Sequence, residues 1–216
     1  GALGGYIGAR LAAAGEDVVF IARGAHLAAM QATGLRIESP YGDLHLAKVA
    51  ATDNPAEVAL VDVILFAVKL WDTDTAAAQM RPMLGPQTRV VTVQNGVDSV
   101  EAIARHVPRG QVAGAVTYIP ASLAAPGVIH NPGGRKDITV DRDHGNATVA
   151  AFAAAAARAV GLEVALSDDI GTVTWSKFVR FAAFSADFLA SPEGAPSKTA
   201  AGEAGAAVEP QPAAEE

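Results

Sequence analysis

Runs of consecutive apolar residues, each followed by a segment with helical spacing, recur along most of this 216-residue chain. Residues 61–68 read Val-Asp-Val-Ile-Leu-Phe-Ala-Val, with one polar residue in the run. Such a run is typical of a parallel strand covered on both faces, whereas a strand with one solvated face alternates apolar and polar residues. The same pattern predicts strands at 18–21 and 90–93, and helices at 25–31, 72–83 and 99–105. This alternation predicts an α/β fold built on a doubly wound parallel sheet.

The first residues, Gly1-Ala2-Leu3-Gly4, match part of a turn that binds a dinucleotide. That turn reads G-x-G-x-x-G between a strand and a helix, where the second glycine lets the backbone approach the pyrophosphate and the third lets the helix pack close to the sheet. Gly1 and Gly4 fit these two positions, so the backbone of Gly1, Ala2, Leu3 and Gly4 is the candidate pyrophosphate site of a Rossmann-like domain. The preceding strand and first glycine are expected to be missing. Alone, the turn is a weak signal, because glycines also allow helices to pack closely.

Other segments of the chain predict shorter strands and two further helices. Residues 35–39 and 44–50 flank a turn and predict a hairpin, and residues 111–140 read as strands punctuated by proline and glycine. An alanine-rich helix is predicted at 148–160 and a strand at 163–166. Ser167 is then the expected N-cap of a helix that runs through Trp175 and Lys177 to 186, with acidic residues in its first turn.

Composition excludes several classes of protein. The chain has no cysteine, which rules out a disulfide framework, a zinc–cysteine site and a thiol nucleophile; we predict no metal. No run of about 20 apolar residues predicts a membrane span, and a cytoplasmic protein is the expectation.

Much of the net charge of −7 belongs to the last residues. Residues 187–216 hold six acidic side chains and one lysine, Lys198. The rest of the chain is therefore nearly neutral and has no basic stripe, so no nucleic-acid partner is predicted. Residues 187–216 are mostly Ala, Glu, Pro, Gly and Ser, and are predicted to be a disordered acidic tail because they cannot bury enough apolar surface to offset the ordering entropy.

Three polar residues follow predicted strands, where ligands of open α/β sheets bind. A fold that binds NAD places an acidic residue at the end of the second strand, but here that strand is followed by Arg23. Arg23 can pair with a 2′-phosphate, which favours NADP(H), although an arginine at a strand end can also be merely solvated. Lys69 follows the predicted strand at 61–68, and Asn95 follows the one at 90–93. Both are candidate cofactor contacts, with Asn95 near the nicotinamide or substrate. The alternatives are that Lys69 is a merely solvated lysine and that Asn95 belongs to a simple Asn-Gly turn.

Several segments together resemble one family, the ketopantoate reductases (2-dehydropantoate 2-reductases). The resemblance rests on GALGGYIGARLAAAG, FIARGAHL, LFAVKLWDT, VQNGV, YIPASLAAPGVI and SDDI…TWSKF, in the order and spacing of that family. It implies an NADP-binding domain at 1–166 and, at 167–186, the first helix of a truncated all-helical substrate domain. The implied reaction is NADPH-dependent reduction of 2-dehydropantoate to pantoate. By this resemblance Lys177 is the catalytic lysine, while Arg23 and Lys69 contact the adenosine phosphate end.

The sequence departs from the family pattern after Lys177. Asparagines lie four and eight residues beyond the lysine in the best-known members, and these positions are Phe181 and Ser185 here. Ser185 can still bind a hydroxy acid, but phenylalanine offers no hydrogen bond. A small 2-oxo acid remains the expected substrate. The expected assembly is a homodimer. A larger or more apolar oxo acid, or a nucleotide-binding remnant without activity, are the alternatives; the chain as printed is expected to have little activity.

Overall fold

The protein is described here by a computed structural model that covers residues 1–143 and 146–190. The chain divides into two compact units, Gly1–Phe178 and Val179–Glu216. Within the described residues, no helix combines the length and the apolar character needed to cross a membrane. The predicted tail from 191 onward lies outside the described residues.

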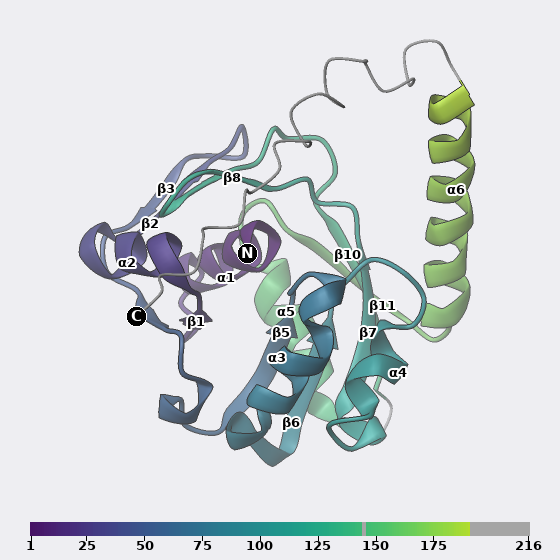
Figure 1. Ribbon diagram of the computed structural model, residues 1–216, viewed down its shortest axis with the longest axis horizontal. Helices are drawn as coiled ribbons and strands as arrows, with labels where there is room; N and C mark the ends of the chain where they lie inside the picture. Colours follow the sequence, from purple (N-terminus) through teal and green to yellow (C-terminus); the bar gives the residue numbers. More distant parts are fainter. Residues whose placement is uncertain (144–145, 191–216) are drawn as a thin grey trace, which may run out of the picture. The chain divides into compact units, whose positions relative to one another are not determined.

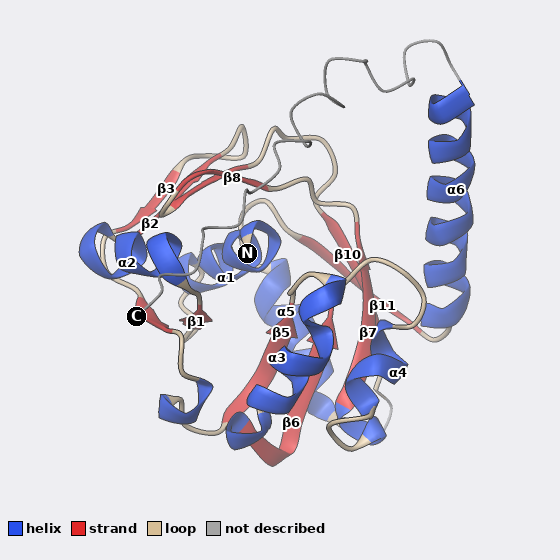
Figure 2. Ribbon diagram, viewed as in Figure 1, coloured by secondary structure: helices blue, strands red, loops and turns tan. Residues whose placement is uncertain are grey.

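The central element of the first unit is a five-stranded sheet in the order β11-β10-β7-β6-β5 (Figures 1 and 2). Its strands are β5 (Val61–Phe66), β6 (Leu84–Thr92), β7 (Val112–Thr117), β10 (Asp137–Asp141) and β11 (Glu163–Ser167). β5, β6 and β7 run parallel to one another, which confirms the predicted α/β fold. β10 is antiparallel to β7, so the sheet is mixed rather than wholly parallel.

Both faces of the parallel strands are buried, as the continuous apolar runs require. Adjacent residues of β6 belong to different cores: Val90 packs with Met80 and Ile103, whereas Val91 packs with Ile7 and Phe152. The first core lies under α3 (Thr73–Gln79) and α4 (Ser99–Ala104), and the second under α1 (Ala2–Ala13) and α5 (Ala147–Ala157). Figure 1 shows α3 and α4 in front of the sheet and α5 behind it.

Smaller sheets complete this unit. One has four strands in the order β3-β2-β9-β8 and contributes Ile37 and Ile129 to the same core as α1. The other is the parallel pair β1-β4. Residues 35–38 and 44–46 pair antiparallel, so the predicted hairpin is confirmed. The remaining elements are β1 (Val19–Ile21), α2 (Gly24–Thr33), β2 (Leu35–Glu38), β3 (Leu44–Leu46), β4 (Ala50–Thr52), β8 (Ser122–Ala125), β9 (Val128–His130) and the short 3₁₀ helices Pro55–Glu57, Leu70–Asp72, Arg81–Met83 and Arg109–Gln111.

The last helix, α6 (Ile170–Ala190), differs from the prediction at both ends. Ser167 is the final residue of β11, and the Oδ1 atom of Asp169 accepts the Thr172 amide at 2.9 Å. Asp169 therefore caps the helix in place of Ser167, because the strand pairs one residue further than predicted. At the other end, α6 continues to Ala190 rather than ending at 186. The predicted helix at 72–83 is also divided, since Pro82 lacks the amide that an α-helix would use.

Candidate active site

The carboxyl ends of three parallel strands bring the candidate polar residues to one edge of the sheet. Lys69 follows β5, Asn95 follows β6 and Thr117 ends β7. Because these strands are parallel and adjacent, the loops that follow them lie on the same side. This edge is where open α/β sheets bind ligands.

Lys177 reaches this edge from α6, within the unit Gly1–Phe178. Its Nζ atom donates hydrogen bonds to Oδ1 of Asn95 at 2.8 Å and to the carbonyl oxygen of Thr117 at 2.7 Å. Burial lowers the pKa of the Lys177 amine from its ordinary value, and the nearby charge of Asp137 opposes that shift. Lys177 and Asn95, predicted from residues far apart in the sequence, are thus brought into direct contact.

Gln94 fixes the loops around Asn95, and the sequence analysis missed it. Its buried side chain donates from Nε2 to the carbonyl of Val68 at 3.0 Å and to Oγ1 of Thr73 at 2.8 Å. These bonds tie the end of β6 to the segment that carries Lys69 and to the start of α3. The available signal in the sequence was Gln94 itself, a polar residue that directly follows apolar Val93 and precedes Asn95. A glutamine that is buried at the end of a strand needs hydrogen-bond partners.

The start of α1 lies against the loop after β5. A Cβ atom on Gly4 would lie 3.0 Å from Cβ of Ala67, and one on Gly5 would lie 2.4 Å from Cδ1 of Ile129. The glycines therefore let the helix approach its neighbours closely. Among the residues that the structure describes, no side chain caps its N-terminus, where the first backbone N–H groups and the helix dipole favour an anion.

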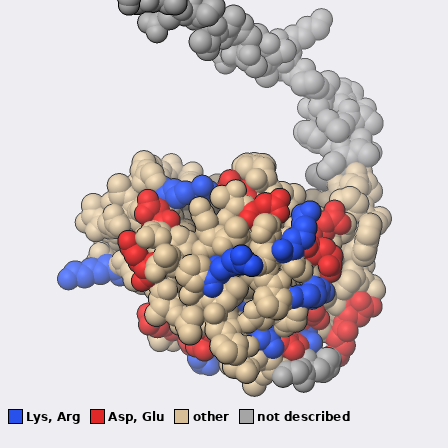
Figure 3. All heavy atoms as spheres, turned by 60° about the horizontal axis from the view of Figure 1, so that its bottom comes forward, with Lys and Arg blue, Asp and Glu red and all other residues tan. Residues whose placement is uncertain are grey.

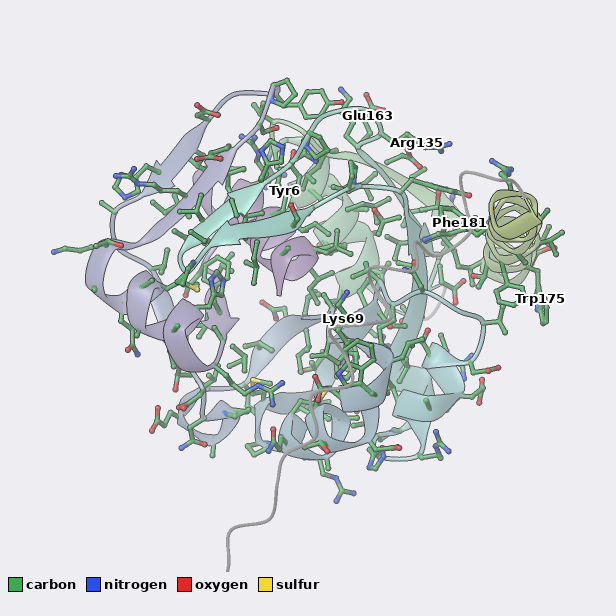
Figure 4. The ribbon with its side chains drawn as sticks, turned by 45° about the horizontal axis from the view of Figure 1, so that its top comes forward. Tyr6, Lys69, Arg135, Glu163, Trp175 and Phe181 are labelled. Atoms are coloured by element: carbon green, nitrogen blue, oxygen red, sulfur yellow. The ribbon has the colours of Figure 1, made fainter. Side chains whose placement is uncertain are left out.

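Two cationic side chains lie near this helix start. Arg23 and Lys69 lie close enough to Gly1 for their positive charges to act on its backbone nitrogen. Arg23 also lies 3.3 Å from Oδ2 of Asp72, and its side chain is 70% exposed. Lys69 is exposed on the loop after β5 (Figure 4). Together with the uncapped helix, these groups suit a phosphorylated dinucleotide.

Ser185 and Phe181 both lie on α6. Ser185 lies beyond Ala183, the last residue whose side chain the structure describes, so its predicted contact with substrate stays a prediction. Phe181 is exposed. Both positions belong to the second unit.

Comparisons with known proteins agree on one family. The protein-family model described as "Ketopantoate reductase PanE/ApbA" matches residues 1–143 of this chain. A 2-dehydropantoate 2-reductase of Mesorhizobium japonicum is 34% identical and the match covers 82% of this chain and 60% of that protein. A crystal structure of 2-dehydropantoate 2-reductase from Porphyromonas gingivalis W83 is similar with a TM-score of 0.79 and 34% identity, covering 89% of this chain and 70% of that one.

A more distant structure shares the fold. The ternary structure of D-mandelate dehydrogenase with NADH and anilino(oxo)acetate matches with a TM-score of 0.72 at 23% identity, covering 82% of this chain and 57% of that one. The chain spans about 60% of the length of the first curated relatives that it matches.

Proposed function

The chain belongs to the ketopantoate reductase family, and from this premise we propose that it reduces 2-dehydropantoate to pantoate with NADPH. The observation that carries the proposal is the position of the Lys177 ammonium, which donates to Asn95 and Thr117 at the ends of β6 and β7. A cation held there can meet a carbonyl oxygen at the edge of the sheet.

The chemistry follows from the charge that the reaction creates. NADPH, when bound, supplies a hydride to the ketone carbon, and negative charge then develops on the carbonyl oxygen. The Lys177 ammonium stabilises that charge and donates a proton to it, which converts the oxygen into the hydroxyl group of the product. Partial burial of Lys177 lowers its pKa, so the amine releases its proton more readily than an exposed lysine. Asn95 orients the ammonium through its Oδ1 atom.

Binding of NADP(H) in preference to NAD(H) is part of the proposal. The backbone of Gly1, Ala2, Leu3 and Gly4 opens an uncapped helix that suits the pyrophosphate. Arg23 takes the place of the acidic residue that would bind the ribose hydroxyls of NAD and carries the charge that a 2′-phosphate needs. Lys69 adds a second charge near the same helix start.

The domain division is likewise proposed. Residues 1–166 contain the helix, strands and loops that would hold the dinucleotide. Helix α6 then begins the substrate domain and supplies Lys177, with Ser185 as a further donor or acceptor for the substrate. This division separates cofactor binding from substrate selection along the chain.

The test is the consumption of NADPH by the purified protein with 2-dehydropantoate, followed by identification of pantoate as the product. Substrate-dependent oxidation of NADPH would support this proposal and would overturn the expectation of little activity. The protein would instead be a nucleotide-binding remnant if it binds NADPH without oxidising it and if Lys177→Ala leaves that binding unchanged.

A second candidate substrate is a larger or more apolar 2-oxo acid. Phe181 lies four residues after Lys177, and its side chain cannot form a hydrogen bond with a hydroxy acid. A panel of 2-oxo acids with aliphatic and aromatic side chains, compared by kcat/KM, separates the two. A higher value for an aromatic oxo acid than for 2-dehydropantoate would favour this second substrate.

A further inference from the structure

The ring of Tyr118 lies against two cationic side chains. The Cζ atom of Arg135 is 3.9 Å from the ring centroid, and the Nζ atom of Lys177 is 5.1 Å from it. Both distances fall in the range of cation–π attraction, in which the negative face of the ring attracts a cation. Tyr118 also directly follows Thr117, whose carbonyl accepts a hydrogen bond from Lys177.

Arg135 is itself held by a carboxylate. Its Nε and Nη2 atoms donate to the two oxygens of Asp137 at 2.8 and 2.9 Å. This paired geometry fixes the plane of the guanidinium group. The hydrogen bonds that Arg135 donates to Asp137 raise the pKa of Arg135 and lower the pKa of Asp137.

The pairing of β10 with β7 sets this arrangement opposite Lys177. The Asp137 carbonyl accepts from Oγ1 of Thr117 at 3.0 Å and from the Tyr118 amide at 3.4 Å. Arg135 precedes β10 and lies near that strand in Figure 4. The backbone therefore places the Arg135–Asp137 pair beside the same two residues that contact the lysine.

We propose that Tyr118 is a positioning residue that holds the Lys177 ammonium with the face of its ring, and that the Arg135–Asp137 pair holds Tyr118. The inference deepens the proposed function, on which it rests for the role of Lys177. Tyr118 supplies attraction without a negative charge, so the ammonium keeps a proton that it can still release.

Removing Asp137 and removing Arg135 should shift the pKa of Lys177 in opposite directions. Asp137 raises the pKa of Lys177, so Asp137→Asn removes a stabilising charge and leaves Arg135 uncompensated. The apparent pKa of Lys177 should then fall. Arg135→Gln leaves Asp137 without its guanidinium partner, and the apparent pKa should rise. Asn95 and Thr117 contribute neutral oxygens to the amine.

The first experiment measures this amine without requiring turnover. The protein is labelled with a limiting amount of acetic anhydride at a series of pH values, and modification of Lys177 is quantified by mass spectrometry. We expect shifts of about half a pH unit in opposite directions for Asp137→Asn and Arg135→Gln. Arg81→Gln, at an exposed arginine before β6, is the matched control and should leave the labelling curve unchanged. Shifts in the same direction, or none, would overturn the inference.

The second experiment separates the ring face from simple bulk. Tyr118→Phe keeps the ring, and Tyr118→Leu keeps an apolar side chain without it. We expect kcat to fall about two- to thirtyfold in Tyr118→Leu, the range of a cation–π contact, with KM for NADPH unchanged and kcat restored in Tyr118→Phe. Equal kcat in both variants would overturn the role of the ring. If the unmodified protein shows no turnover, the proposed function fails, while the labelling experiment still decides the inference.

Discussion

At the scale of single residues, positively charged side chains are the recurring feature of the site. Lys177 donates to neutral oxygens of Asn95 and Thr117. Arg23 is exposed near the start of α1. The sequence predicted the residue types and the strand ends that carry them. It could not predict that Tyr118 faces Lys177, because that contact depends on how β10 and α6 meet the end of β7.

Arg23 offers a residue-scale prediction about cofactor choice. If Arg23 binds the 2′-phosphate as proposed, replacing it with serine removes a charge-assisted contact of about 1.5–3 kcal/mol. Affinity for NADPH should fall roughly ten- to hundredfold, whereas affinity for NADH, which lacks that phosphate, should change little. Isothermal titration calorimetry with both cofactors measures this ratio. Equal losses for NADPH and NADH would show that Arg23 does not read the phosphate; Arg81→Ser is the control.

At the scale of elements, close approaches of backbone decide which positions tolerate a side chain. Gly34 ends α2 with φ +82° and leads into β2. A Cβ atom there would lie 1.9 Å from the carbonyl oxygen of Leu46. The hairpin of β2 and β3 was predictable from its alternation and turn residues. Its packing against the end of α2 was not, because no local pattern encodes a contact between the helix end and the second strand.

Replacing Gly34 with alanine should destabilise the protein by about 2 kcal/mol or more, because strain at positive φ adds to the backbone clash. Gly42→Ala is the matched control, since Gly42 also has positive φ (+106°) but a Cβ atom there meets nothing within 4 Å. Its cost should be about 1 kcal/mol. Urea denaturation of both variants measures the difference. A Gly34→Ala variant as stable as Gly42→Ala would contradict the close approach.

At the scale of the whole molecule, alternating apolar runs predicted the α/β architecture but not all of its sheets. β5, β6 and β7 form the expected parallel core. The four-stranded sheet joins the hairpin of β2 and β3 to β9 and β8, which lie far away in the sequence, and β10 pairs antiparallel with β7. On the face shown in Figure 3, lysine and arginine side chains are interspersed with aspartate and glutamate. That mixture agrees with the nearly neutral body predicted before residue 187.

Cofactor binding should stabilise the molecule as a whole. NADPH at about one hundred times its Kd adds roughly 2.7 kcal/mol to the free energy of unfolding. For a chain of this size that corresponds to a rise in Tm of about 5–10 °C. NADH at the same concentration should raise Tm less. Thermal unfolding followed by circular dichroism provides the measurement, and equal shifts from the two cofactors would contradict a preference for NADPH.

The most direct test of the central claim is the single-turnover rate of NADPH oxidation by 2-dehydropantoate in the Lys177→Ala variant. A group that donates a proton in the transition state contributes about 10²- to 10⁴-fold, so the rate should fall by that factor. The Kd for NADPH should stay unchanged, because the proposed place of the amine is at the substrate carbonyl rather than at the pyrophosphate. A variant that oxidises NADPH as fast as the unmodified protein would contradict the assignment of Lys177 to the chemical step.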